Sequence, residues 1–285
     1  MSHRNPTLYH AASSYYSMVA RYSLALSGID YQSHLLDIHK KREQLQDWYV
    51  AINPAMTVPT LVTDDKTYTS STAIVQFAIE QRPECWIEST ASSPTNTTST
   101  TSTTVRRDIS ALVDSHDAFA VERLTFNALM KKLPPLRWLF PKMLQKICDG
   151  LAQEIEQGRS NAADVSAAIN IEALQAKLAL NQSRLAYFTG EPLGVRQERQ
   201  IALAQTFVRG FGQAPRGPWL FGDQPSHADV VFIVFLARLR MVGLLEPVQV
   251  PEAFVDWLEQ KTQTQAFKNA DVWVKLQPLR LMSHR

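Results

Sequence analysis

The chain has 285 residues, of which 45% are hydrophobic and 20% are charged, with a formal net charge of +2 at pH 7. This composition excludes a largely disordered chain, and the charge does not predict a broad basic face for nucleic acid. No apolar run approaches the ~18 residues of a membrane span, and the N-terminus lacks an apolar leader, so we expect a cytoplasmic protein. Cys85 and Cys148 lack metal-ligand spacing, so we expect structural thiols and no metal.

The first 80 residues alternate between short strands and helices. Leu8 and Tyr9 form a short apolar run that becomes a strand only if other strands complete a sheet. The pattern then predicts a helix over residues 18–26, a strand over 31–38 and a second helix over 39–51. A hairpin over residues 60–69 and a final helix over 72–79 follow. The resulting β-α-β-α-β-β-α order predicts a compact α/β domain.

Residues 89–104 are almost entirely serine and threonine and cannot bury enough surface to offset the entropy of ordering. We therefore predict a domain over residues 1–85, a linker over 86–105 and an all-helical domain over 106–285. Within the helical domain, Ser226 and Asp229 match a capping box before an apolar helix expected at its centre. The other predicted helices lie at residues 109–128, 163–185, 195–208, 254–261 and 264–270.

The stretch over residues 53–74 carries the pattern with the clearest chemical meaning. Pro59 precedes a strand, and an X-Pro bond can be cis, which would turn the Val58 backbone outward toward an extended ligand. Ser70 and Ser71 open the next helix, where free N–H groups and the dipole favour a carboxylate. These features predict a site for a peptide-like anion, although ordinary strand and turn chemistry explains the same residues without a ligand.

Three segments resemble the glutathione S-transferase superfamily. LYHAASSYYSMVARYSLALSGIDY resembles the zeta class and its dehalogenase-like relatives, NPAMTVPTL with SSTAI resembles the cis-proline strand and following helix, and PWLFGDQPSHADVVFIVFLARL resembles the capped central helix. The resemblance implies an α/β thioredoxin-like N-terminal domain followed by an all-α C-terminal domain. The enlarged helical region is similar to that of the ganglioside-induced differentiation-associated proteins.

The resemblance also implies a reaction and a cosubstrate. Ser14 holds the position of the catalytic serine, whose hydroxyl donates to the glutathione thiolate at a helix N-terminus. The Val58 backbone, before Pro59, pairs with the cysteinyl backbone of glutathione as an added strand. We therefore expect glutathione conjugation to a small hydrophobic electrophile, with a noncatalytic binding or regulatory protein as the alternative. A homodimer is expected.

The same resemblance assigns the rest of the glutathione site. Ser71 would hold the γ-glutamyl carboxylate, and Ser70 stands where many relatives carry an acid or amide beside the γ-glutamyl ammonium. Gln44 lies near the region that contacts the glycyl group. Tyr16 replaces the cysteine of zeta isomerases and dehalogenases, so those thiol reactions are not expected.

The resemblance further predicts a substrate cleft between the two domains. Tyr15, Tyr16, His116 and Phe119 are its predicted lining, although aromatic packing and a satisfied core histidine explain the same residues. The basic, aromatic segment over residues 131–147 could touch a membrane, but its three prolines predict a broken helix, so membrane contact is not expected. Otherwise this segment would form a wall of the cleft.

Overall fold

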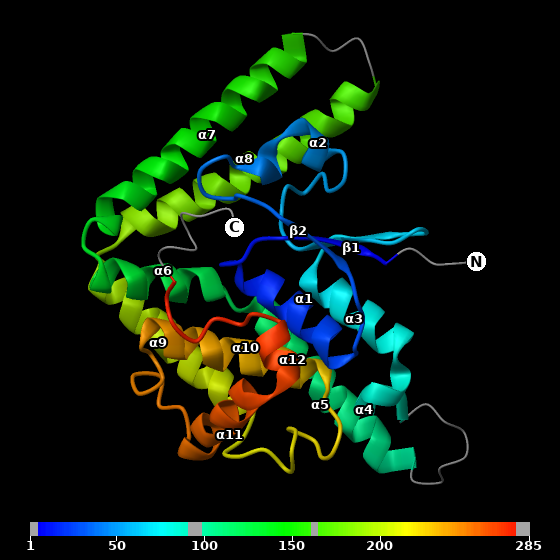
Figure 1. The fold of residues 1–285 in the computed structure, drawn as a ribbon. Helices are drawn as coiled ribbons and strands as arrows, with labels where there is room; N and C mark the ends of the chain where they lie inside the picture. The colour runs from blue at the N-terminus through cyan, green and yellow to red at the C-terminus, as the bar shows by residue number, and fades with distance from the viewer. Residues whose placement is uncertain (1–4, 91–98, 161–164, 278–285) are drawn as a thin grey trace.

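The computed structural model describes residues 5–90, 99–160 and 165–277. Figure 1 shows a small sheet flanked by helices, a larger helical region below it and a long helical hairpin above it. The sheet has the order β2-β1-β3-β4, with β1–β2 parallel and the other pairs antiparallel. Its strands are β1 (Thr7–His10), β2 (Gln32–Leu35), β3 (Thr60–Val62) and β4 (Thr67–Tyr68).

Two helices cover one face of this sheet. α1 (Tyr15–Leu26) and α3 (Ser71–Gln81) lie side by side beneath the strands in Figure 1. Their apolar positions bury Met18, Tyr22 and Ile74 together with Leu8 and Leu61 of the strands. The predicted α/β order is confirmed, because the strands before and after α1 complete the sheet that the short run at Leu8 required.

The predicted helix over residues 39–51 is wrong in extent. The Asp37 carboxylate accepts hydrogen bonds from the N–H groups of His39, Lys40 and Lys41, which holds a turn in place of a helix. Arg42 then adopts a left-handed backbone with φ 52°. The segment consequently contains a 3-10 turn, η1 (Glu43–Leu45), and a single helical turn, α2 (Asp47–Val50).

The rest of the described chain is helical. α10 is its centre, and its capping box is confirmed: Asp229 N donates to Ser226 Oγ at 3.2 Å and Ser226 N donates to Asp229 Oδ2 at 2.8 Å. Arg21 Nε of α1 donates to Ala270 O at 2.7 Å, so the two regions share a packed interface. The bounds are η2 (Pro83–Cys85), α4 (Ile87–Thr90), α5 (Ser99–Ala118), α6 (Val121–Lys132), α7 (Leu136–Ser160), α8 (Val165–Gly190), α9 (Leu193–Gly210), α10 (His227–Val242), α11 (Glu252–Gln263) and α12 (Gln265–Asn269).

Two sequence predictions differ from these bounds. The single helix over residues 109–128 is interrupted at Phe119, whose ring packs on Phe207 of α9 and Phe235 of α10. The predicted linker over residues 86–105 contains α4 and the first turns of α5, while residues 91–98 lie outside the described chain. α5 begins early because the amphipathic pattern that follows extends the helix back into the Ser/Thr run.

The prolines of residues 131–147 do not break the helix there. Pro134 and Pro135 precede α7, where an N–H donor is not needed, and Pro141 lies inside the helix without ending it. α7 and α8 form a long antiparallel hairpin that extends beyond the rest of the molecule in Figure 1. Phe140 is buried, whereas Trp138 and Leu139 are exposed, so this segment does not pack as the inward wall that was the alternative.

Candidate functional site

One edge of the sheet collects the segments predicted to form the site. β1 and β2 are parallel, so the loops that follow them leave from the same edge. β3 runs antiparallel to β1, with Thr60 opposite Tyr9, so Val58 and Pro59 enter at that edge. β4 runs back toward the same edge and leads into Ser70 at the start of α3. Topology therefore places the starts of α1, β3 and α3 together.

Ser14 caps the N-terminus of α1. Its Oγ accepts a hydrogen bond from Ser17 N at 3.3 Å, so the hydroxyl hydrogen can still be donated to a ligand. The side chain is partly exposed. A hydroxyl donor at the positive end of a helix suits a bound thiolate. The residue meets the geometric needs of the predicted role, and that role remains a prediction.

The peptide bond between Val58 and Pro59 is cis. Neither the N–H nor the C=O of Val58 makes a hydrogen bond within the described part of the chain. The preceding turn is fixed by buried groups: Asn53 Nδ2 donates to Thr57 O at 3.0 Å and to Thr60 Oγ1 at 2.9 Å. A rigid support beneath an unpaired backbone unit is suited to a strand-like ligand.

The start of α3 supplies N–H groups, and an acidic side chain from another helix lies beside it. Ser70 is the N-cap, accepting from Ala73 N at 3.1 Å, while Ser71 is buried. Thr72 Oγ1 donates to Asp117 Oδ2 of α5 at 3.0 Å. Sequence reasoning missed Asp117, because only tertiary packing brings the end of α5 to α3. The negative charge absent at Ser70 is therefore present beside the same helix start.

Asp117 belongs to a chain of hydrogen-bonding groups between the two regions. His116 Nδ1 lies 3.0 Å from Asp117 Oδ1, and His116 Nε2 lies 2.9 Å from the Tyr15 hydroxyl. The hydrogen bond to His116 is the main reason that the pKa of Asp117 lies below its ordinary value. Asp117 itself is exposed, so an ionised carboxylate faces solvent at the start of α3.

Three of the four residues predicted to line the substrate cleft are buried. Tyr15 is held by His116 and by Val231 O, at 2.9 and 3.1 Å, and Phe119 packs in the core between α9 and α10. These residues join the domains and do not form an open surface. Tyr16 alone is partly exposed, and burial, with the charges of Asp117 and Glu122, raises its pKa. Its hydroxyl is therefore a neutral donor.

The loop after β2 forms another side of this edge. Ser13 Oγ lies 2.9 Å from His39 Nε2, and burial lowers the pKa of that imidazole. Gln44 Nε2 donates to Ile38 O at 3.5 Å, whereas Gln44 Oε1 is buried without a hydrogen-bond partner among the described residues. Gln44 lies in η1 and not on the predicted helix, and its contact with the glycyl group stays a prediction.

The α7–α8 hairpin reaches the loop before Pro59. Lys177 Nζ donates to Met56 O at 2.7 Å, and burial lowers the pKa of Lys177 to about 8. Met56 is fully buried against Leu151, Ile155 and Leu174 of the hairpin. Figure 1 shows α8 alongside α2, in agreement with this cluster. The hairpin therefore covers the connection between β2 and β3, which sequence reasoning did not anticipate.

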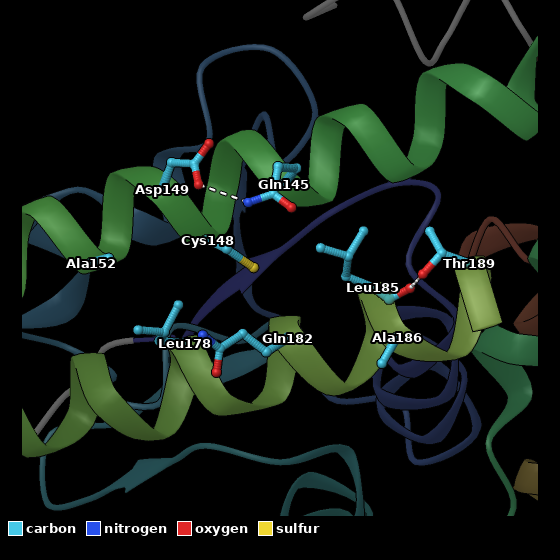
Figure 2. Close-up of a pocket in the computed structure, with 9 residues that line it drawn as sticks. All are labelled: Gln145, Cys148, Asp149, Ala152, Leu178, Gln182, Leu185, Ala186 and Thr189. Carbon is cyan, nitrogen blue, oxygen red and sulfur yellow. Dashed lines mark hydrogen bonds between the residues drawn. The ribbon is translucent and has the colours of Figure 1, made fainter.

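A separate pocket of about 390 Å³ lies between α7 and α8 (Figure 2). Cys148 contributes its sulfur atom to this pocket, between Gln145 and Leu185. Burial and the neighbouring Asp149 raise the pKa of the Cys148 thiol, so it is not activated as a nucleophile. Cys85 and Cys148 are both free thiols.

Within residues 5–90, 99–160 and 165–277, no cluster of three or more His, Cys, Asp or Glu side chains is arranged to hold a metal. In those same ranges, none of the helices combines the length and apolar character that crossing a bilayer requires.

The fold and the sheet-edge site define a thioredoxin-like domain joined to an all-helical domain. Residues 8–86 match the family model "Glutathione S-transferase, N-terminal domain", and residues 153–260 match "Glutathione S-transferase, C-terminal domain". The matched segments follow each other in the family's order and make up more than half of the chain. The chain belongs to the glutathione S-transferase superfamily.

One curated relative is a probable maleylacetoacetate isomerase from Caenorhabditis elegans, 36% identical over 84 residues. The match covers 30% of this chain and 38% of the isomerase, well under half of that protein's length.

The solved structures include glutathione transferase Omega 3C from Trametes versicolor, with a TM-score of 0.55, 17% identity and coverage of 98% of this chain and 89% of that chain. A bacterial zeta-class maleyl pyruvate isomerase has a TM-score of 0.53 and 20% identity, and the alignment covers 95% of this chain and 98% of that one. Ure2p in complex with glutathione has a TM-score of 0.53 and 15% identity over 94% of this chain and 98% of its own. At these identities the likeness establishes the fold.

Proposed function

We propose that this protein is a glutathione transferase that conjugates glutathione to a small hydrophobic electrophile. The observation that carries the proposal is the unpaired backbone of Val58, supported from below and flanked by the starts of α1 and α3. Glutathione is an extended, anionic tripeptide whose backbone can pair with such an edge. The family membership and the glutathione-bound fold neighbour support the choice of this thiol.

Each end of glutathione has a partner in this arrangement. The γ-glutamyl carboxylate would accept from N–H groups at the start of α3 near Ser70 and Ser71, and its ammonium would face the ionised Asp117. Gln44 would contact the glycyl group at the other side of the edge. Asp117 would supply, from α5, the acid that Ser70 lacks.

In the proposed reaction, the Ser14 hydroxyl donates to the glutathione sulfur and favours the thiolate. The thiol proton passes to solvent, the thiolate forms a carbon–sulfur bond with the electrophile, and the bond to the leaving group breaks. The free thiol has a pKa of about 8.5, so each unit by which the site lowers this pKa raises the fraction of glutathione present as thiolate severalfold near pH 7. Tyr16 offers a second neutral hydroxyl and no thiol, so conjugation is favoured over isomerisation.

A noncatalytic binding or regulatory protein with the glutathione S-transferase fold is the second candidate. The specific observation in its favour is the α7–α8 hairpin, which packs on the loop before Pro59 through Lys177 and Met56. A covering element fixed at the site would restrict access of an electrophile while leaving an interaction surface outside. We further propose a cytoplasmic homodimer that does not bind nucleic acid.

Calorimetry with reduced glutathione and turnover of a generic aryl halide test these alternatives. Binding at submillimolar concentration with turnover supports the transferase, and binding without turnover for several electrophiles supports the noncatalytic protein. Absence of binding at several millimolar would overturn the transferase and favour the noncatalytic protein. Sedimentation equilibrium tests the dimer independently, with a monomer at micromolar concentration as the contrary result.

A further inference from the structure

Exposed apolar side chains are concentrated where α6 ends and α7 begins. Leu133, Trp138 and Leu139 are 44%, 59% and 47% exposed. The other large hydrophobic side chains with comparable exposure are distributed over several elements: Leu35, Trp48, Leu180, Val195 and Leu203. A local group of exposed apolar side chains on a folded protein indicates an interaction surface.

The same segment is strongly basic. Between Glu122 and Asp149 the chain has no acidic residue, whereas its net charge over all 285 residues is only +2. Lys142 Nζ lies 3.9 Å from the centre of the Trp138 ring, so cation and aromatic share one face. The basic residues from 131 to 147 are Lys131, Lys132, Arg137, Lys142 and Lys146. We call these five together with Leu133, Trp138 and Leu139 the α7 patch.

The α7 patch is held on a rigid support. Phe140, directly after Leu139, is buried and stacks on Phe126 of α6 with ring centres 4.0 Å apart. Phe140 also meets Phe188 of α8 edge to face at 4.9 Å. With Phe140 fixed inward, helical geometry keeps Trp138 and Leu139 on the outer side. Their exposure is therefore a property of the packed helix.

We propose that the α7 patch binds the surface of a membrane that contains anionic phospholipids. Trp138, Leu139 and Leu133 would enter the boundary between headgroups and acyl chains, where tryptophan is favoured. The lysine and arginine side chains would lie against the headgroup phosphates, with their alkyl stems over the apolar side chains. The broken helix that made membrane contact unexpected from the sequence is absent, because α7 continues through Pro141. This inference is independent of the proposed glutathione chemistry.

The combination of groups favours a bilayer over a protein partner. A helix that lies in the membrane interface pairs tryptophan and leucine with lysine on its flanks, as the α7 patch does. The lysines 131, 132, 142 and 146 are exposed, so they can adjust to a fluid array of phosphates. The cations exceed the anions by five over this segment, which matches an anionic surface.

Sedimentation of the full chain with vesicles tests the proposal. We expect the chain to bind vesicles in which about one third of the lipid is phosphatidylserine and the rest is phosphatidylcholine. Binding to pure phosphatidylcholine should be at least tenfold weaker, and binding to the anionic vesicles should weaken as the salt concentration rises. Each of Lys131→Gln, Lys132→Gln, Lys142→Gln and Lys146→Gln should lower the partition coefficient about fivefold. Trp138→Ala should lower it about tenfold. Lys268→Gln and Leu203→Ala, which alter exposed residues elsewhere, should leave it unchanged.

Brominated lipids locate the tryptophan. Acyl-chain bromines should quench the fluorescence of the wild type and of Trp48→Phe, and this quenching should be lost in Trp138→Phe. No binding to anionic vesicles, equal binding to neutral ones, or quenching that survives Trp138→Phe would overturn the proposal. Dissociation of an oligomer by Trp138→Ala without vesicle binding would overturn it too, in favour of contact between two copies. Urea midpoints and circular dichroism confirm that the variants fold.

Discussion

Lys177 of α8 donates a hydrogen bond to the carbonyl oxygen of Met56 over 2.7 Å. This bond joins the long hairpin to the turn that leads into Val58 and Pro59. The ammonium is buried, and its pKa is lowered to about 8 by that burial. The hairpin is therefore coupled to the candidate glutathione site by this hydrogen bond and by the apolar packing on Met56.

Lys177→Met is expected to loosen this turn with little change in global stability. The lost hydrogen bond contributes about 1–3 kcal/mol, and removing a buried cation offsets much of that amount. Hydrogen exchange should show faster exchange at the Met56 amide, which donates to Asn53 O at 2.9 Å. Lys268→Met, at an exposed lysine, is the control. Unchanged exchange at Met56 would show that the hairpin does not hold the turn.

Ser14→Ala is expected to reduce thiolate formation and turnover while glutathione binding is retained. Loss of one hydrogen bond to the anion corresponds to about 1.5–3 kcal/mol, or roughly 10- to 100-fold in turnover. Thiolate absorbance in the ultraviolet measures the pKa of bound glutathione, which should rise. Ser13→Ala is the matched control, because its hydroxyl pairs with His39. Equal effects of the two substitutions would remove Ser14 from the mechanism.

Asp117→Asn is expected to weaken glutathione binding about tenfold, because it removes a charge-assisted contact at the start of α3. A glutathione analogue without the γ-glutamyl ammonium should bind wild type and variant equally. Asp114→Asn, on the preceding turn of α5, provides the control. Titration calorimetry measures the constants, and an equal loss for the analogue would mean that Asp117 acts only by supporting the fold.

His10 should make the protein sensitive to acid. Its Nδ1 accepts from Arg21 NH1 at 3.1 Å and its Nε2 meets Ser33 Oγ at 2.7 Å, so the folded state requires the neutral ring. Burial, aided by Arg21, lowers its pKa from 6.5 to about 3. The unfolded chain takes up the proton first as pH falls, so stability decreases below pH 6.5 by up to about 1.4 kcal/mol per unit.

Urea unfolding at pH 7 and pH 5 measures this effect, which should be about 2 kcal/mol for His10 alone. His10→Asn keeps an acceptor for Arg21 and should reduce the difference between the two pH values by that amount. The same pH dependence in the variant would assign the acid sensitivity to other groups, such as buried His227, whose pKa is also lowered, to about 4.

Local patterns predicted the parts of the site that depend on neighbouring residues. The N-cap at Ser70 and the capping box at Ser226 each follow from a short motif, whereas the cis bond at Pro59 was implied by the family resemblance, and the structure has all three. Asp117 and Lys177 were not predicted. Each reaches the sheet edge from a distant helix, and neither has a sequence motif that indicates its destination.

Each error in the predicted secondary structure has a physical cause in the structure, either a local backbone feature or packing between helices. The polar stretch after β2 reads as a helix by composition, yet the left-handed backbone of Arg42, with φ 52°, interrupts a continuous helix there. At Phe119, aromatic packing outweighs the continuous helical pattern. At Pro141, neighbouring turns and the packing of Phe140 sustain a helix that the sequence alone argued against.

The burial of Met56 beneath the hairpin determines how the protein can be divided. A fragment ending near residue 86 would leave Met56, Leu45 and Val50 facing water, because their cover comes from residues of α7 and α8. We therefore expect the thioredoxin-like region to be less stable when it is cut at its own sequence boundary. Excision of the hairpin should produce an aggregating remainder unless residue 56 is made polar at the same time.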